Sequence, residues 1–317
     1  MAEIKHRTMK TNGINMHIAE AGSGPLVLML HGFPESWYSW RHQIPALADA
    51  GYHAVASDIR GYGGTDKPQE IEAYAMKTLV DDAVGVLDAL GEQTAVVVGH
   101  NWGAPMAWQS ALTNPDRFRA VVGMSVPYTG RPPMAPTKLF EMAFPNNFFY
   151  IRYFQEPGVA EAELEADVRR SLRLVLCIAF GDARTDAGLM SKPRDATFLQ
   201  GLVEPERLPS WLTEADIDYY TGEFQRSGFR GPLNRYRSMD RDWEHSPELE
   251  GAKVQQPTLF IAGELDPVIR NPSAIETMKQ NITNLRDVVL LPGAGHWTQQ
   301  ERPKEVNAAL IDFLKGR

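Results

Sequence analysis

Hydrophobic and polar positions follow two alternating patterns along the first half of the chain. Short apolar runs rich in β-branched residues are typical of buried strands, and they span 25–32, 51–58, 94–100 and 118–127. Longer stretches with apolar residues at helical spacing lie between them, at 36–50, 73–90 and 103–112. Because strands that alternate with helices form a parallel sheet covered on both faces, this pattern predicts an α/β protein.

The alternation stops after Pro127 and returns near Ala252. In between, the chain is rich in Pro, aromatic and charged residues and shows helical patches without strands; the longest is VAEAELEADVRRSLRLVLCIAF, residues 159–180. Two strand-like runs and a closing helix then follow, at 256–267, 285–296 and 303–316. The sequence therefore predicts a core of 1–128 and 247–317, with a mostly parallel central sheet flanked by helices, and a helical cap, 129–246, inserted into it.

Composition narrows the functional classes. Of the 317 residues 43% are hydrophobic and 23% are charged, which is typical of a folded globular protein. A net charge of −8 argues against a nucleic-acid partner, and no apolar run approaches the roughly 18 residues that span a membrane. The single cysteine, Cys177, cannot form an internal disulfide, so we expect a reducing, cytoplasmic location.

Candidate chemistry gathers where the predicted strands end. Several strand-like runs lead directly into side chains or amides that can act as acids, bases or hydrogen-bond donors: His31-Gly32, His100-Asn101-Trp102, Asp266 and His296. In an open parallel sheet, ligands bind beyond the carboxyl ends of the strands. These residues are far apart in the sequence, but we expect the fold to bring them to one edge of the sheet.

The segment VVGHNWGAPMAW (97–108) has the form of a strand, a sharp turn and a helix. Such an elbow displays a nucleophile above the sheet, close to a helix N-terminus that favours negative charge. Gly99 and Gly103 leave room for the turn. The displayed residue is Asn101, whose neutral amide is a poor nucleophile, and Asn is also a favoured helix cap. These residues alone fit either a nucleophile elbow or an ordinary capped turn.

His296 and Asp266 follow consecutive strand-like runs near the C-terminus, in LLPGAGHW and IAGELDPV. A histidine in such a loop can act as a general base, and a carboxylate can fix its tautomer. Each also has a simpler interpretation, as a structural histidine and as a turn residue. In chain order, residue 101, Asp266 and His296 match the order nucleophile, acid, base of the α/β hydrolases. In such a fold the amides of Phe33 and Trp102 would form the oxyanion hole.

Together these motifs resemble the α/β-hydrolase-fold epoxide hydrolases. The resemblance rests on HGFPESWYSW, DIRGYGGTDKP, VVGHNWGA, FYIRYFQEPGVAEAELE, AGELDPV and GAGHW, and it extends over nearly the whole chain. In that family the elbow reads G-H-D-W-G with aspartate as the nucleophile, so this chain departs at Asn101. The resemblance implies two cap tyrosines that bind the epoxide oxygen; by motif position they are Tyr150 and Tyr236, with Tyr153 as a competitor for the first.

The reaction that the resemblance implies has two steps and uses no cofactor or metal. A carboxylate at position 101 opens the epoxide and forms an alkyl-enzyme ester, and His296 with Asp266 then activates the water that releases a vicinal diol. Asn101 keeps the shape of the elbow but lacks the charge, so we expect an inactive or very slow variant. The apolar character of FPNNFF favours a small apolar epoxide, held between Phe33, Trp102 and the two tyrosines.

Two alternatives stay open. Haloalkane dehalogenases share the fold and the aspartate elbow, although they usually carry Asn at the third position of HGxP, where this chain has Phe33. A ligand-binding protein on a retired hydrolase scaffold would also tolerate Asn101, although the intact His296, Asp266 and tyrosines argue against it. A serine esterase is disfavoured, because no serine occupies the elbow.

Overall fold

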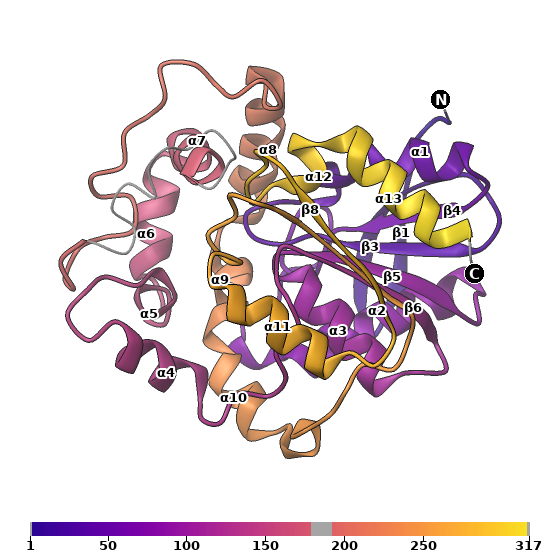
Figure 1. Ribbon diagram of the computed structural model, residues 1–317. Helices are drawn as coiled ribbons and strands as arrows, with labels where there is room; N and C mark the ends of the chain where they lie inside the picture. Colours follow the sequence, from indigo (N-terminus) through magenta and orange to yellow (C-terminus); the bar gives the residue numbers. More distant parts are fainter. Residues whose placement is uncertain (1, 179–191, 316–317) are drawn as a thin grey trace.

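The centre of the molecule is an eight-stranded sheet (Figure 1). The computed structural model describes residues 2–178 and 192–315. The strands are β1 (Lys5–Thr11), β2 (Ile14–Ala21), β3 (Leu26–Leu30), β4 (His53–Ser57), β5 (Ala95–His100), β6 (Phe118–Met124), β7 (Thr258–Gly263) and β8 (Leu285–Leu291). They lie side by side in the order β1-β2-β4-β3-β5-β6-β7-β8.

The helices fall into two groups along the chain. Those that alternate with the strands are α1 (Gln43–Asp49), α2 (Met76–Leu90), α3 (Gly103–Thr113), α11 (Pro272–Asn281), α12 (Thr298–Glu301) and α13 (Pro303–Lys315), with the 3-10 helices η1 (Trp37–Trp40) and η2 (Ile71–Tyr74). Those between β6 and β7 are α4 (Pro136–Ala143), α5 (Tyr150–Tyr153), α6 (Val159–Ala166), α7 (Val168–Ile178), α8 (Glu214–Ser227), α9 (Arg230–Arg237), α10 (Met239–Glu244) and η3 (Pro247–Leu249). We call this second group the helical insertion.

The direction of the strands confirms the predicted α/β class. Neighbouring strands from β3 to β8 pair in parallel. The predicted helix at 36–50 is a 3-10 turn, η1, followed by the short α1. Strands β1 and β2, which the sequence analysis did not predict, form an antiparallel hairpin, and β2 also pairs antiparallel with β4. The hairpin turns at Asn12 and Gly13, whose positive φ angles of 42° and 78° suit a tight Asn-Gly turn.

Both faces of the sheet are buried under helices. On β3, Leu26, Leu28 and Leu30 belong to the apolar cluster that includes α2 and α3, while Val27 and Met29 belong to the cluster that includes α1 and α13. Because successive side chains of a strand point to opposite faces, a continuous apolar run serves both clusters. This explains why the parallel strands appear in the sequence as unbroken apolar runs.

The helical insertion agrees with the predicted break in the strand pattern, but its longest predicted helix is two helices. Helix α6 ends at Ala166 and α7 begins at Val168, because Asp167 has extended backbone angles (φ −149°, ψ 89°). The Asp167 carboxylate accepts a hydrogen bond from the Arg170 amide (3.0 Å) and thereby caps α7. Residues 179 and 180 at the end of that prediction, and 316 at the end of the last predicted helix, lie outside the described residues.

The insertion is fixed to the sheet domain at several points. The rings of Tyr38 (η1) and Tyr219 (α8) stack with centroids 4.0 Å apart, and Arg41 forms an ion pair with Asp216 (3.1 Å). At another point, the indole of Trp297 donates to the carbonyl of Leu176 in α7 (2.7 Å). In Figure 1 the insertion helices lie beside the sheet as a separate layer.

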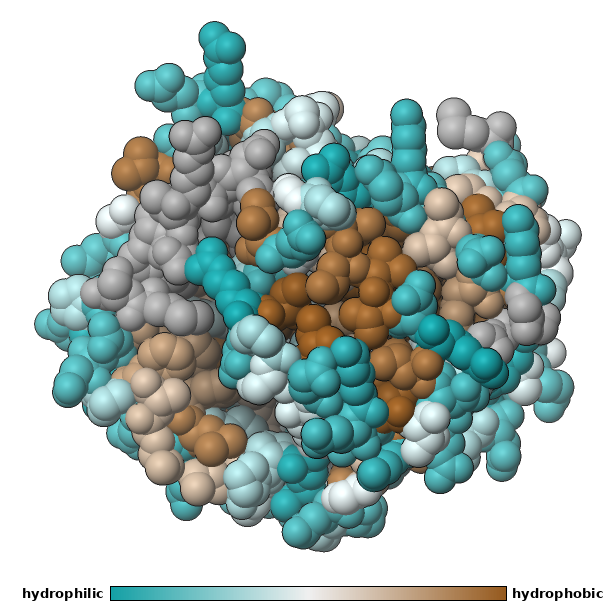
Figure 2. All heavy atoms as spheres, in the orientation of Figure 1, coloured by the Kyte–Doolittle hydropathy of each residue, from teal (hydrophilic) through white to brown (hydrophobic). Residues whose placement is uncertain are grey.

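Within the described ranges, no helix is long and apolar enough to cross a membrane. The side chain of Cys177 is buried. Figure 2 shows polar side chains over most of one face, with an apolar area near its centre where Figure 1 draws β8 and α11. Leu290 on the edge strand β8 is among the exposed apolar side chains.

Candidate active site

Asn101 lies in a sharp turn between β5 and α3. Its φ of 53° is left-handed, a conformation that Asn tolerates better than most residues. The strand and the helix approach so closely that a Cβ on Gly99 would lie 1.9 Å from the Gly103 carbonyl oxygen, and one on Gly103 would lie 2.0 Å from that of Leu30. Only glycine fits at both positions, so the local sequence fixes an elbow that presents residue 101.

The side chain of Asn101 is held by three hydrogen bonds. Its Oδ1 accepts from the backbone amides of Phe33 (3.1 Å) and Trp102 (2.7 Å), and its Nδ2 lies 2.6 Å from His296 Nε2. Because Nδ2 can only donate, His296 accepts through Nε2 and carries its proton on Nδ1. A carboxylate would place one oxygen between the same two amides and its other oxygen toward the imidazole.

Asp266 orients the histidine from the other side. His296 Nδ1 donates to Asp266 Oδ2 (3.0 Å), and the buried carboxylate also accepts from the Val268 amide through Oδ1 (2.9 Å). Burial alone would lower the pKa of His296, but the charge and hydrogen bond of Asp266, with smaller contributions from Glu35 and Glu301, outweigh burial and raise it. The arrangement is that of a general base whose tautomer is fixed by a carboxylate.

A buried carboxylate, Glu35, lies behind this pair and was not singled out by the sequence analysis. It accepts hydrogen bonds from His100 Nδ1 (2.8 Å) and from the side-chain amides of Gln299 (3.1 Å) and Gln300 (3.0 Å). His100 Nε2 donates to the backbone carbonyl of His296 (2.7 Å). Burial would raise the pKa of Glu35, but the charge and hydrogen bond of His100 outweigh burial and lower it, so a buried carboxylate supports the loop that carries His296.

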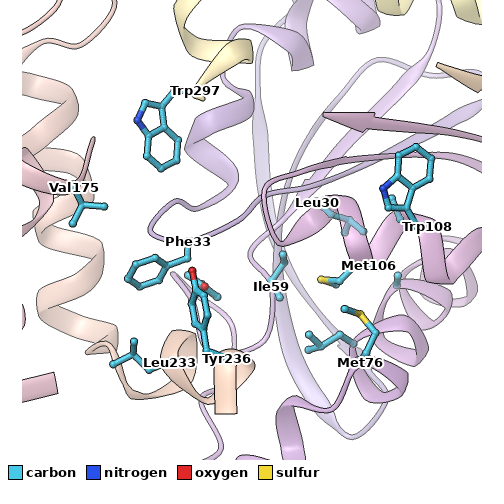
Figure 3. Packing of buried hydrophobic residues seen from close by; sticks show 14 of the residues in the cluster. Leu30, Phe33, Ile59, Met76, Met106, Trp108, Val175, Leu233, Tyr236 and Trp297 are labelled. Carbon is cyan, nitrogen blue, oxygen red and sulfur yellow. The ribbon is translucent and has the colours of Figure 1, made fainter. Parts of the chain in front are cut away.

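The two predicted tyrosines come together above the elbow. Tyr150 (α5) and Tyr236 (α9) have ring centroids 6.1 Å apart and nearly perpendicular planes. Figure 3 shows Tyr236 next to Phe33, and their centroids are 5.6 Å apart. Burial and the charge of Asp266 raise the pKa of Tyr150 to about 12, and burial raises that of Tyr236 well above its usual range. Both phenols therefore keep their protons at neutral pH and can donate hydrogen bonds.

Tyr153, the competitor for the first tyrosine position, is engaged elsewhere. Burial, together with the charge and a hydrogen bond of Glu163 in α6, raises its pKa. Its ring packs against Phe148 with centroids 5.7 Å apart, whereas Tyr150 packs against Tyr236. The geometry thus favours Tyr150 at the site.

His31, which also ends a strand, has a structural environment. Its Nδ1 donates to the Gly32 carbonyl (2.8 Å) and its Nε2 accepts from the Ile59 amide (3.1 Å), so both ring nitrogens are satisfied. In residues 2–178 and 192–315, no group of three or more His, Cys, Asp or Glu side chains is arranged to hold a metal ion.

An elbow followed in the chain by an acid and then a base, at the ends of parallel strands, defines the α/β hydrolases. A family model described as the alpha/beta hydrolase fold matches residues 25–303. Epoxide hydrolase A of Mycobacterium tuberculosis is 48% identical over 322 residues, which cover 100% of this chain and 99% of that protein. The chain belongs to the epoxide hydrolases of this fold.

Solved structures lead to the same family. The epoxide hydrolase from an endophytic Streptomyces superposes with a TM-score of 0.95 at 48% identity, covering 99% of this chain and 96% of that one. Epoxide Hydrolase A from Mycobacterium thermoresistibile superposes with a TM-score of 0.93 at 49% identity, covering 99% of both chains.

Proposed function

We propose that the chain holds the machinery for hydrolysing small apolar epoxides to vicinal diols, with the nucleophile arrested as Asn101. The observation that carries the proposal is the seating of Asn101, whose amide bridges the Phe33 and Trp102 amides on one side and His296 on the other. An aspartate in the same place would receive both the donors and the base that an ester cycle needs.

The first step would open the ring. With aspartate at position 101, a carboxylate oxygen attacks one epoxide carbon and the ring C–O bond breaks. Tyr150 or Tyr236 donates its proton to the alkoxide that forms, and an alkyl ester joins residue 101 to the substrate. The aromatic surroundings of these hydroxyls, which include Phe33 and Phe154, favour an apolar substituent on the epoxide.

The second step would hydrolyse the ester. His296 removes a proton from water, the oxygen attacks the ester carbonyl carbon, and the amides of Phe33 and Trp102 hold the oxyanion. When the bond between the carbonyl carbon and the alkyl oxygen breaks, His296 returns the proton to that oxygen and the diol leaves. The carboxylic acid at position 101 gives its remaining proton through solvent to the tyrosinate, which restores the starting state.

Asn101 would stop this cycle before the ester forms. Its amide has the shape of a carboxylate but no charge, and its nitrogen lone pair is delocalised, so it does not displace the epoxide oxygen. We infer that the chain binds the epoxide without turning it over. The single, buried Cys177 suits a reducing compartment, and we propose the cytoplasm as its location.

Turnover of a panel of aryl and alkyl epoxides by the Asn101→Asp protein tests the proposal. We expect diol formation to rise by about three orders of magnitude or more over the Asn101 protein, and Asn101→Ala to stay inert. A haloalkane given to the same protein should release no chloride. An inert Asn101→Asp protein would instead indicate a ligand-binding role, and chloride release would indicate a dehalogenase.

Intact mass must accompany these assays, because hydrolysis of the Asn101 amide would itself produce aspartate. Such a conversion adds about one dalton and would return activity in aged samples. Full activity in fresh protein of unchanged mass would show that residue 101 is not the nucleophile.

A further inference from the structure

Arg235 is a buried cation next to the candidate site that the reaction described above does not use. It lies on α9 directly before Tyr236, is 4% exposed, and forms an ion pair with Asp242 on α10. It also donates to the backbone carbonyl of Tyr74. These contacts anchor both terminal nitrogens, while its Nε is a buried donor without a partner in the described part of the chain.

The guanidinium of Arg235 lies over the indole of Trp102. Its central carbon is 4.9 Å from the ring centroid, within the range of a cation–π interaction. The same indole meets the ring of Tyr236 nearly edge to face, with centroids 5.0 Å apart. Trp102 therefore lies between the cation and the phenol.

We propose that Arg235 is a positioning residue: by stacking on Trp102 it fixes the indole against the ring of Tyr236 and holds a positive charge near this phenol, and thereby strengthens Tyr236 as the hydrogen-bond donor to the bound epoxide oxygen. A positive charge held close to a phenol stabilises the negative charge that its oxygen develops when the O–H donates a proton. The O–H of Tyr236 therefore becomes a stronger acid and a better hydrogen-bond donor.

Two groups around Tyr236 act on its pKa in the direction that this proposal requires. Burial raises the pKa of Tyr236, and the neighbouring Tyr150 and Tyr62 raise it further, whereas the adjacent Trp102 and the charge of Arg235 lower it. Arg235 is not among the groups that shift the pKa of Tyr150. Its effect is thus directed to one of the two phenols.

The proposal can be tested without turnover, on the chain with Asn101 in place. A fluorinated tyrosine at position 236, whose fluorine nuclei report ionisation by NMR, gives the pKa of this phenol alone. We expect Arg235→Met combined with Asp242→Asn to raise that pKa by about half a unit to one unit. Arg235→Lys, which keeps the charge but not the flat stacking group, should raise it less. The same probe at position 150 should not respond.

A variant that is expected to shift the pKa at position 236 in the opposite direction serves as a control for a general structural effect. Asp242→Asn alone leaves Arg235 without its counter-charge and should lower the pKa of the phenol at 236. If that pKa stays unchanged in folded Arg235→Met/Asp242→Asn and Asp242→Asn proteins, the inference is wrong; a simple loss of packing would not move it in two opposite directions.

The catalytic consequence rests on the proposed function. In the Asn101→Asp background we expect Arg235→Met to slow ester formation about three-fold or more, with rescue by Arg235→Lys. An inert Asn101→Asp protein that still shows the phenol shifts would refute the proposed function and leave the role of Arg235 standing. An active Asn101→Asp protein without the shifts would refute the role of Arg235 alone.

Discussion

In the proposed reaction, the protonation of His296 would decide whether an ester at residue 101 is released. Burial alone would lower the pKa of His296, but the charge and hydrogen bond of Asp266, followed by the charges of Glu35 and Glu301, raise it above its ordinary value of 6.5. A general base must be neutral, and His296 becomes neutral only as the pH rises through this raised pKa. As the pH falls, the hydrolytic step therefore begins to slow at a higher pH than it would with an ordinary histidine.

In the Asn101→Asp protein we accordingly expect the acid limb of ester hydrolysis to lie above pH 6.5. Glu35→Gln removes a negative charge near His296, lowers its pKa and moves the limb to lower pH. The pH dependence of ester decay in a single turnover measures the position of the limb with and without Glu35→Gln. Glu276→Gln, an exposed pair partner of Lys279, is the matched control and should leave the limb in place. A limb that does not respond to Glu35→Gln contradicts this account.

At this scale, some site residues are predictable from the sequence and others are not. Asn101, Asp266 and His296 each lie in the loop that follows a strand, so a rule about the carboxyl ends of strands finds them. Glu35 escapes that rule, because its role depends on donors from distant segments, such as His100 and Gln300, that only the fold brings to it. The one local signal is a carboxylate in the HGFPESWY segment, close to several aromatic residues.

At the scale of elements, the elbow depends on close contact between backbone atoms of β3, β5 and α3. A Cβ on Gly103 would meet the Leu30 carbonyl oxygen at 2.0 Å, and backbone cannot move aside without separating the strands. In contrast, a Cβ on Gly222 in the middle of α8 would meet only the flexible end of Arg226 at 3.3 Å. The same substitution should therefore have opposite effects at these two glycines.

We expect Gly103→Ala to lower the free energy of unfolding by about 3 kcal/mol or more, or to prevent folding. Gly222→Ala should leave that free energy unchanged or raise it by up to about 1 kcal/mol, because alanine is the better helix former. Urea unfolding of both proteins provides the measurement. A Gly103→Ala protein as stable as the parent would mean that the elbow is less tightly packed than described.

The same elements show where pattern reading stops. The parallel strands were predicted because burial on both faces leaves an unbroken apolar run. Strand β1 is mostly exposed and has no such run, so the Asn12-Gly13 turn is the only feature of the sequence that indicates the hairpin. The break between α6 and α7 depends on a single capping side chain, Asp167, inside a sequence that otherwise has helical spacing.

At the scale of the whole molecule, a chain of polar contacts joins the helical insertion to Glu35, the buried carboxylate near His296. Asp216 on α8 pairs with Arg41, and Arg41 donates to Gln300 (2.8 Å). Gln300 in turn donates to Glu35 (3.0 Å), which lies behind His296. The docking of the insertion and the surroundings of the base are therefore parts of one hydrogen-bonded network.

Arg41→Met should loosen this docking without unfolding α8, because Asp216 keeps its capping contacts with Thr213. Loss of the largely buried ion pair, whose side chains are 11% and 9% exposed, should speed amide hydrogen exchange in α8 about ten-fold while α13 exchanges as before. Arg117→Met breaks a more exposed pair with Asp88 and is the control, with no change expected in α8. Unchanged exchange in α8 would mean that the other contacts, such as the stacking of Tyr38 on Tyr219 and the hydrogen bond from Trp297 to Leu176, hold the insertion in place without this ion pair.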